Sequence, residues 1–276
     1  MSLKHFFAIL LALVMAVTGH GVFINTFWAI DRTDMMQAAV YEAPDGTALP
    51  YRIYVPENYN PARKYPLVLF LHGTGERGGD NRAHTEKGSV MQTLLGEDNL
   101  TQFPCVVVAP QCPGAAWWPL LTTQLMGLLE QTRKAYSVDA ARIYITGISL
   151  GGYGTWSMLA EYPGYFAAAV PICGGGDPGT APLLLDIPIW AFHGARDLIV
   201  RPDSGGLSKA LGVNNKELRG LLAQAVNTRS MVKALQEAGS TAVKYTEYPR
   251  EGHFCWELAY REPALFEWMF TQTRTK

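Results

Sequence analysis

Short apolar runs alternate with amphipathic stretches along most of the chain. Tyr65–Leu71 is a continuous apolar run, which is typical of a strand buried on both faces. Similar runs recur at Cys105–Ala109, Arg142–Thr146, Ala167–Ile172 and Ile187–Phe192, and a more polar one follows at Val243–Tyr248. Between the runs, residue patterns predict helices at Ser89–Leu95, Leu120–Tyr136, Thr155–Glu161, Thr228–Ala238 and Pro263–Thr273. This alternation predicts an α/β fold with a mostly parallel sheet and helices on both faces.

Two shorter strand-like stretches precede the parallel part. Gln37–Tyr41 and Leu49–Val55 flank Pro44-Asp45-Gly46, a sequence that favours a tight turn. They predict an antiparallel hairpin at the start of the sheet. A chain of 276 residues that is 48% hydrophobic can bury one large core, so residues 37–276 are expected to form a single domain.

The N-terminus has the features of a targeting segment. Lys4 and His5 precede the apolar run Phe6–Val17, which has the length of a signal-peptide core and is short for a membrane span. A second apolar patch, Val22–Ile30, leaves open an uncleaved N-terminal anchor. Residues 1–30 are therefore expected to be a signal peptide or an anchor with a short leader. The protein is expected to be secreted or periplasmic, with any membrane contact made through that anchor.

Charge and cysteine content limit the expected partners and cross-links. The net charge is −1 and no basic run is present, which argues against a nucleic-acid partner. Cys105, Cys112, Cys173 and Cys255 could form two disulfides in three ways. A strand between Cys105 and Cys112 would hold them roughly 20 Å apart, so that pair is not expected. A core of this size is also compatible with four free thiols.

The chemistry of the chain is organised around Gly147–Gly151, a Gly-x-Ser-x-Gly pentapeptide between a β-branched run and a helical stretch. In that context the pentapeptide forms a nucleophile elbow, a strained turn that lifts the serine Oγ clear of the sheet. The glycines lack a Cβ and let strand and helix approach closely. The alternative is a glycine-rich turn with an incidental serine. Strand and helix on the correct sides favour Ser149 as a nucleophile.

A glycine-rich loop, His72–Gly79, follows the first buried strand. In nucleophile-elbow enzymes the corresponding loop supplies one N–H of the oxyanion hole, and the residue after the nucleophile supplies the other. These two donors are assigned to Thr74 and Leu150. A tight glycine turn or an anion nest is the alternative. A phosphate loop fits badly, because no Gly-Lys-Ser/Thr closes the sequence.

The expected acid of the catalytic group is Asp197. It follows the strand Ile187–Phe192 and fits the chain order Ser…Asp…His of nucleophile-elbow enzymes. Asp177, after the preceding strand, is the second choice. Asp186 precedes its strand and so lies at the wrong end of the sheet, because ligands of parallel sheets gather at the carboxyl ends of the strands.

The expected general base is His253, which lies just past Val243–Tyr248 and before the last helix. The other histidines are in the leader (His5, His20), on the predicted first helix (His84), at the start of the glycine loop (His72) and before the acid (His193). His193 comes before Asp197, against the expected order. His72 ends a strand and more simply braces its loop. His253 is therefore selected by elimination and by position.

Trp117, Trp118 and Trp256 lie near strand ends, where they could line an aromatic acyl or alcohol pocket. Core packing is the alternative for each of them. Asp203–Val226, shortly after the expected acid, carries an apolar stripe at helical spacing. This inserted helical segment is expected either to pack on Thr228–Ala238 or to cap the pocket at Ser149.

Several motifs together resemble a known family: Tyr51–Pro56, Leu69–Gly79, Ala109–Pro113 with Trp117-Trp118, Thr146–Trp156, Pro171–Pro178 and Gly252–Trp256. They resemble secreted α/β-hydrolases of the phospholipase/carboxylesterase and polyhydroxybutyrate-depolymerase-like (feruloyl esterase-like) esterase group. The resemblance covers most of Tyr41–Thr273. It implies the α/β-hydrolase fold and cleavage of carboxylic esters, including aryl and feruloyl esters, without cofactor or metal. It places the family's nucleophile, acid and base on Ser149, Asp197 and His253, and it is weak for substrate.

Two other functions share these features. A serine peptidase of the prolyl-oligopeptidase type has the same fold and the same order of catalytic residues, but usually carries a large extra domain for which this chain has no room. A binding protein on an inactive hydrolase scaffold is the other possibility, and the intact set of Ser149, Asp197 and His253 argues against it. The sequence therefore favours a serine esterase acting on a small-molecule or polymer-linked ester.

Overall fold

The computed structural model of the protein describes residues 33–86, 90–202 and 226–274, which all belong to one compact unit. The predicted leader over residues 1–30 lies outside the described residues, and so does residue range 203–225 of the predicted insertion. Among the helices in the described ranges, none combines the length and the hydrophobicity that crossing a bilayer requires.

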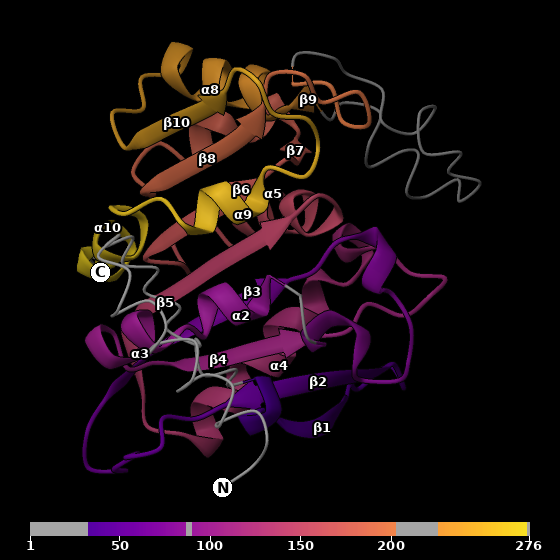
Figure 1. Cartoon of the computed structure of the whole chain (residues 1–276), viewed down its shortest axis with the longest axis vertical. Coiled ribbons are helices and arrows are strands. Elements are labelled where there is room, and N and C mark those ends of the chain that lie inside the picture. The colour runs from indigo at the N-terminus through magenta and orange to yellow at the C-terminus, as the bar shows by residue number, and fades with distance from the viewer. Residues whose placement is uncertain (1–32, 87–89, 203–225, 275–276) are drawn as a thin grey trace, which may run out of the picture. The chain divides into compact units, whose positions relative to one another are not determined.

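Eight strands of the described residues form one sheet (Figure 1) in the order β1-β2-β4-β3-β5-β6-β8-β10. The neighbours from β4 to β10 are parallel, whereas β1 pairs antiparallel with β2, and β2 with β4. The strands are β1 (Gln37–Glu42), β2 (Ala48–Tyr54), β3 (Tyr65–Leu71), β4 (Val106–Pro110), β5 (Val138–Ile148), β6 (Ala168–Ile172), β8 (Ile189–Gly194) and β10 (Val243–Tyr248). The predicted sheet and its antiparallel start are confirmed.

The hairpin β1–β2 turns at Pro44-Asp45-Gly46 as predicted. Gly46 has a φ of 82°, a conformation that residues with a Cβ rarely adopt. Asp45 Oδ1 accepts the Thr47 N–H at 2.9 Å, and Ala43 and Thr47 close the turn through their backbones. The local sequence therefore fixes the register of the hairpin.

Helices cover both faces of the sheet. Alternate residues of β3 enter two separate cores: Leu67 and Leu69 belong to one, Val68 and Phe70 to the other. The first core is closed by α4 (Thr122–Ala135), α5 (Leu150–Glu161) and α8 (Thr228–Glu237), and the second by α2 (Met91–Leu94), α3 (Glu97–Gln102), α9 (Trp256–Tyr260) and α10 (Leu265–Thr271). Burial on both sides explains why the central strands are continuously apolar.

Some elements differ from the prediction. Helix α5 begins at Leu150 rather than Thr155, because the glycines that follow the serine are poor helix formers and hide the helix in the sequence. Strand β5 is longer than Arg142–Thr146 at both ends. A two-stranded ribbon of β7 (Gly175–Gly176) and β9 (Val226–Asn227) was not predicted, and its strands are too short to give a pattern.

Candidate active site

Ser149 stands at the sharp turn between β5 and α5, where the pentapeptide predicted a nucleophile elbow. Its φ of 53° and ψ of −113° are strained for a residue with a side chain. A Cβ on Gly151 would lie 1.9 Å from the Leu71 carbonyl oxygen, and a Cβ on Gly147 would lie 2.3 Å from the Gly151 oxygen. The glycines are therefore required by close backbone approach, and this packing holds the serine in its strained conformation.

His253 lies between Ser149 and Asp197. Its Nε2 is 2.8 Å from Ser149 Oγ, and its Nδ1 is 2.7 Å from Asp197 Oδ2. Because a carboxylate can only accept, Nδ1 carries the proton and donates it to Asp197. Nε2 is left as the acceptor for the serine hydroxyl, which is the arrangement that a general base needs.

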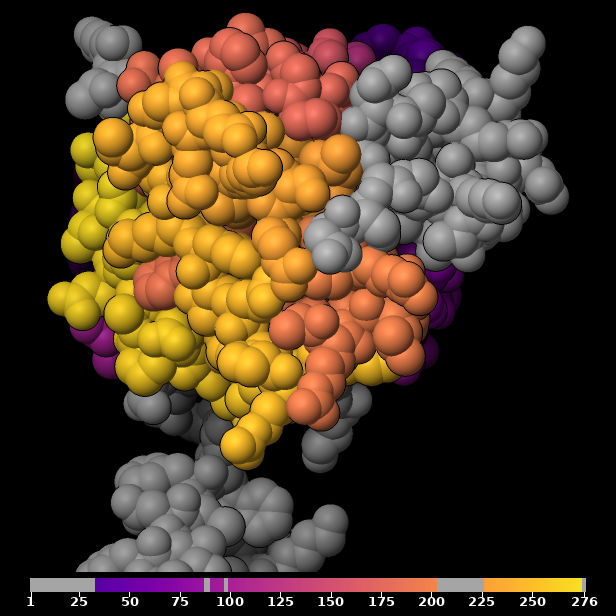
Figure 2. Space-filling view, turned by 90° about the horizontal axis from the view of Figure 1, so that it is seen from above, coloured from indigo at the N-terminus to yellow at the C-terminus, as the bar shows by residue number. Residues whose placement is uncertain are grey.

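Asp197 and His253 come from loops that follow β8 and β10, two neighbouring strands. The Arg196 N–H donates to the Glu251 carbonyl oxygen at 2.9 Å, which joins the two loops. In Figure 2 the orange part of the chain near residue 200 borders the yellow C-terminal part. The Asp197 side chain is fully buried. Burial would raise the pKa of its carboxyl group, but hydrogen bonds from His193 and His253 outweigh this effect and hold that pKa well below its usual value.

The structure does not bring the two competing carboxylates to His253. Asp177 is the N-cap of the 3₁₀ helix η5 (Pro178–Leu183), and its Oδ1 accepts the Gly179 N–H at 2.8 Å. Asp186 is exposed and precedes β8, at the end of the sheet away from Ser149, as predicted.

Thr74 and Leu150, the predicted oxyanion donors, each begin a helical turn. Thr74 opens the 3₁₀ helix η2 (Thr74–Glu76) after β3, and Leu150 opens α5 after β5. The first N–H groups of a helix have no acceptor within it, so both are available to a bound oxygen. Since β3 and β5 are adjacent and parallel, the two donors stand at the same edge of the sheet.

His72 braces this loop rather than taking part in proton transfer. Its Nε2 accepts the Cys112 N–H at 2.9 Å, which fixes the proton on Nδ1, and Nδ1 donates to the Gly73 carbonyl oxygen at 2.7 Å. Burial lowers the pKa of His72 to about 3, so the ring is neutral. Its 3.9 Å approach to Glu76 is consequently not an ion pair.

Glu76 closes the same turn and was not singled out by the sequence. Its Oε2 accepts the Gly73 N–H at 2.9 Å, three residues back along the chain. Burial raises the pKa of Glu76 to about 7, and the hydrogen bond from Gly73 offsets only part of that effect. The loop that carries Thr74 thus contains a carboxyl group that titrates near neutral pH.

Of the three tryptophans predicted to line the pocket, Trp118 lies in the core. It is fully buried, its Nε1–H donates to the His72 carbonyl oxygen at 3.0 Å, and its ring meets the His72 ring edge-on at 5.1 Å. The prediction that Trp118 contacts substrate is therefore wrong, because the side chain supports the glycine loop from beneath. Trp117 is half-buried under the Arg77 guanidinium, 4.8 Å from its ring centre.

Trp256 and Phe254 surround the ring of His253. Their ring centres lie 5.5 and 5.7 Å from that of His253 and 5.0 Å from each other. Trp256 is half-buried, whereas the Phe254 side chain is 72% exposed, which is unusual for a phenylalanine. Phe254 is not among the residues that the sequence predicts for the pocket, although its place next to the expected base points to it.

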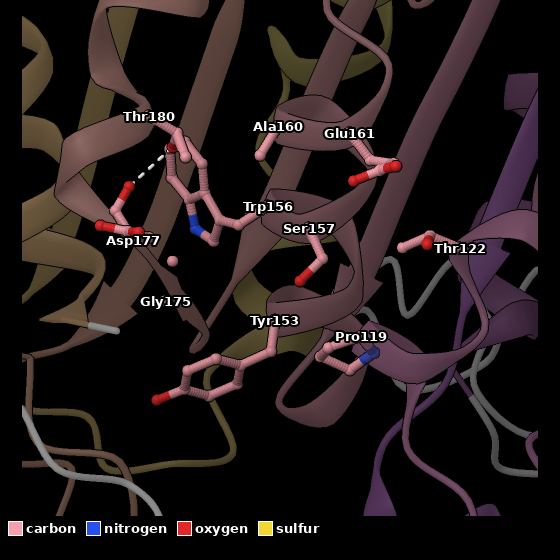
Figure 3. A pocket seen from close by; sticks show the side chains of 11 residues that line it. Pro119, Thr122, Tyr153, Trp156, Ser157, Ala160, Glu161, Gly175, Asp177 and Thr180 are labelled. Atoms are coloured by element: carbon pink, nitrogen blue, oxygen red, sulfur yellow. Dashed lines mark hydrogen bonds between the residues drawn. The ribbon is translucent and has the colours of Figure 1, made fainter. Parts of the chain in front are cut away.

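A pocket of about 190 Å³ runs along α5 (Figure 3). Tyr153, Trp156 and Ser157 of α5 form one wall, and Asp177 and Thr180 lie across from them. Trp156 is buried, and its Nε1 has no hydrogen-bond partner among the described residues. The pocket begins one helical turn beyond Ser149, so it lies beside the catalytic group rather than at it.

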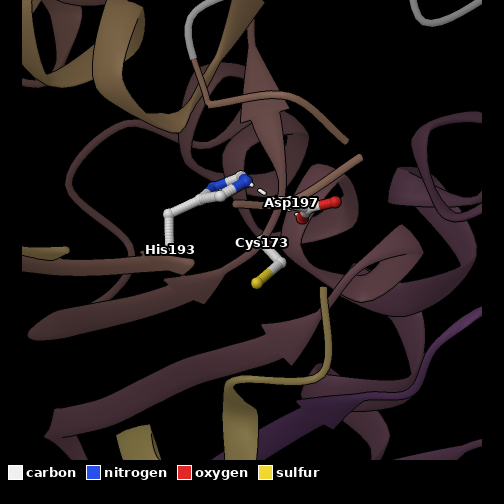
Figure 4. A group of neighbouring side chains, drawn as sticks. All are labelled: Cys173, His193 and Asp197. Atoms are coloured by element: carbon white, nitrogen blue, oxygen red, sulfur yellow. Dashed lines mark ion pairs between the residues drawn. The ribbon is translucent and has the colours of Figure 1, made fainter. Parts of the chain in front are cut away.

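Cys173, His193 and Asp197 are one group in the described residues whose side-chain ligand atoms all lie within 4.8 Å of one another (Figure 4). They are poorly suited to a metal. The hydrogen bond to Cys255, together with burial, raises the pKa of the Cys173 thiol well above its usual value, so the thiolate that a metal needs is disfavoured. Cys173 Sγ lies 3.2 Å from Cys255 Sγ, and all four cysteines are buried free thiols.

Comparisons with known proteins agree with this geometry. The family model "Putative esterase" matches residues 46–183, half of the chain. The solved structure of a thermostable esterase is 37% identical, with a TM-score of 0.72 over 88% of this chain and 64% of that chain. The predicted α/β-hydrolase fold is confirmed by this likeness.

Two curated relatives are more distant. A bifunctional acetylxylan esterase/xylanase of Neocallimastix patriciarum is 26% identical over 162 residues, which are 57% of this chain and 22% of the relative. Feruloyl esterase C of Emericella nidulans is 26% identical over 162 residues, covering 56% of this chain and 57% of the relative. The chain thus spans less than two thirds of the length of each.

Proposed function

Because this chain belongs to the esterase family whose model it matches, we propose that it is a serine hydrolase that cleaves carboxylic esters through an acyl-enzyme on Ser149. The observation that carries the proposal is the hydrogen-bonded series Ser149–His253–Asp197, in which the serine sits at a strained strand–helix turn. A non-catalytic scaffold would have no reason to keep the strain and the two short hydrogen bonds together.

The reaction follows from the position of each proton. His253 Nε2 takes the Ser149 hydroxyl proton as Oγ attacks the ester carbonyl carbon, and Asp197 stabilises the imidazolium that forms. The N–H groups of Thr74 and Leu150 donate hydrogen bonds to the carbonyl oxygen and stabilise the negative charge that develops on it. His253 then protonates the leaving alcohol, and water repeats the sequence on the acyl-enzyme to release the acid and free Ser149.

The proposed substrates are aryl, feruloyl-type or short-chain acyl esters, either small molecules or groups attached to a polymer. The acetylxylan and feruloyl esterases among the relatives support this class. Phe254 and Trp256 support the aryl members of the class, since two aromatic side chains beside the base give a flat acyl group a surface to pack on.

We also propose that the protein is exported from the cytoplasm. Lys4 and His5 followed by Phe6–Val17 have the order of charged and apolar residues that secretion signals use. An extracellular or periplasmic place would suit an ester carried by a polymer. N-terminal sequencing of the protein recovered from outside the cytoplasm tests this part directly.

The test of the catalytic proposal is Ser149→Ala against Ser157→Ala, a control serine inside the helix that Ser149 precedes. Ser149→Ala should lower kcat on p-nitrophenyl acetate by about 10⁴-fold with Tm nearly unchanged, while Ser157→Ala stays at the wild-type rate. A fluorophosphonate should add to the wild-type protein and to Ser157→Ala, and a peptide map should place the adduct on Ser149.

Three outcomes would contradict the proposal. Substantial activity in Ser149→Ala would remove the serine from its role. No hydrolysis and no fluorophosphonate adduct would favour the inactive scaffold. A substrate panel that turns over peptides faster than esters would favour the serine peptidase of the prolyl-oligopeptidase type.

A further inference from the structure

His193 is a buried histidine that the reaction above does not use. It is the next-to-last residue of β8 and is fully buried, and Asp197 lies four residues further on. Figure 4 shows its ring reaching toward the Asp197 carboxylate. Chain order excludes it as the general base, so its place beside the acid needs another explanation.

The contacts of the His193 ring show that Nε2 carries a proton. Nε2 lies 2.7 Å from the Val200 carbonyl oxygen and 3.2 Å from Asp197 Oδ2. Both partners can only accept, so Nε2 carries a proton. It donates this proton to the Val200 carbonyl oxygen, the shorter contact, and directs the same positive edge of the ring at Asp197 Oδ2. Nδ1, on the other side of the ring, lies 2.7 Å from the Thr228 hydroxyl at the start of α8, which holds that edge in place.

Asp197 is surrounded by donors on both oxygens. Oδ1 accepts the N–H groups of Ile199 and Val200, each at 2.8 Å. Oδ2 accepts from His253 Nδ1 at 2.7 Å, and His193 Nε2 lies 3.2 Å from the same oxygen. The backbone N–H groups fix Oδ1, whereas Oδ2 depends on side chains, and the torsion about the Cβ–Cγ bond is intrinsically broad. His193 beside Oδ2 opposes a twist that would move this oxygen away from His253.

We propose that His193 is a positioning residue: its Nε2–H holds Asp197 Oδ2 in the orientation that receives the His253 Nδ1–H. The operating unit is then Ser149–His253–Asp197–His193. The inference rests on the proposed function for its kinetic consequence, and on the buried contacts of His193 for its geometry. A misplaced carboxylate would leave substrate binding intact and slow proton transfer, so kcat should change and KM should not.

Two amide variants separate positioning from folding. In His193→Gln the amide nitrogen reaches the place of Nε2 and can still donate to Asp197. In His193→Asn the shorter amide reaches only the place of Nδ1, so it retains a partner in Thr228 and loses Asp197. His84→Asn is the matched control, because His84 is also fully buried and its Nε2 lies 2.9 Å from the Ala109 carbonyl oxygen.

We expect His193→Asn to lower kcat on p-nitrophenyl acetate about 10- to 100-fold with KM within about twofold. His193→Gln should recover at least about tenfold of that loss, and His84→Asn should keep kcat within about threefold despite a similar fall in Tm. Equal kcat losses in His193→Asn and His84→Asn, a change in KM instead of kcat, or no recovery in His193→Gln would overturn the inference.

A second measurement does not depend on turnover. The proton between His253 Nδ1 and Asp197 should give a strongly downfield ¹H NMR signal in the wild type. That signal should shift or broaden in His193→Asn and remain in His193→Gln and His84→Asn. If the wild type hydrolyses no ester but the signal responds in this way, the proposed function fails and the positioning stands. An unchanged signal in His193→Asn would refute the positioning itself.

Discussion

Replacing Glu76 by glutamine should make the protein more stable at alkaline pH and leave it nearly unchanged at acid pH. The carboxyl group lies inside the glycine loop with only 24% of its side chain exposed, and Oε2 accepts the Gly73 N–H. The amide oxygen of glutamine can accept the same N–H. The substitution therefore removes the ability to ionise and little else.

The sign and size follow from the pKa of Glu76, which burial raises from 4.5 to about 7. Between these values the folded protein holds a proton that the unfolded chain has released, so stability falls as pH rises through this window. At about 1.4 kcal/mol per pKa unit, the full difference is about 3 kcal/mol above pH 7. Residual contact with water reduces this, and we expect Glu76→Gln to gain roughly 1–3 kcal/mol at pH 8.

The assay is chemical denaturation of both proteins at pH 5 and pH 8, with the difference in unfolding free energy compared between the two. Glu130→Gln is a control of opposite sign. Burial of Glu130 would raise its pKa, but hydrogen bonds from Tyr165 and Arg133 outweigh this and lower it. Glu130→Gln should therefore lose stability at pH 8. An advantage of Glu76→Gln that is the same at both pH values would refute the reasoning.

Two further predictions concern the nucleophile elbow and the exposed Phe254 beside His253. Gly151→Ala should destabilise the protein by about 3 kcal/mol or more, because the added Cβ would sit 1.9 Å from the Leu71 carbonyl oxygen. Gly127→Ala should cost much less, because its Cβ meets only the end of the Tyr41 side chain. Equal losses of Tm in the two variants would contradict this. Phe254→Ala should raise KM about fivefold or more for feruloyl esters and leave KM for acetate esters within about twofold, and equal changes on both would remove Phe254 from substrate contact.

The fold and the core of the site were readable from the sequence where the signal is local. β3 and β10 begin and end at the predicted residues. Burial along its whole length gives β3 a continuous apolar run, whereas β10 is a partly buried edge strand that a turn follows. The elbow pentapeptide indicates Ser149, a strand end and chain order indicate Asp197, and elimination and position indicate His253. The structure places His253 within hydrogen-bonding distance of both other side chains. Topology alone does this, since parallel neighbours deliver their loops to one edge.

Other features depend on contacts between distant segments. The sequence predicts Trp118 in the pocket, whereas the packing of the loop after β4 on His72 buries this side chain. The significance of Glu76 and of His193 arises from burial and from partners that no spacing in the sequence reveals. Cys173 and Cys255 are 82 residues apart and their contact at 3.2 Å could not be selected among the three pairings.

The strand order has a consequence for synthesis and for engineering. The oxyanion loop, the nucleophile, the acid and the base follow β3, β5, β8 and β10, and β10 is the edge strand of the described sheet, paired with β8. The base is therefore the last of the four to be synthesised, and it reaches the site only when β10 pairs with β8. The turn at Gly239, with a φ of 98°, separates α8 from β10. A cut there would place the nucleophile and the acid on one fragment and the base on the other.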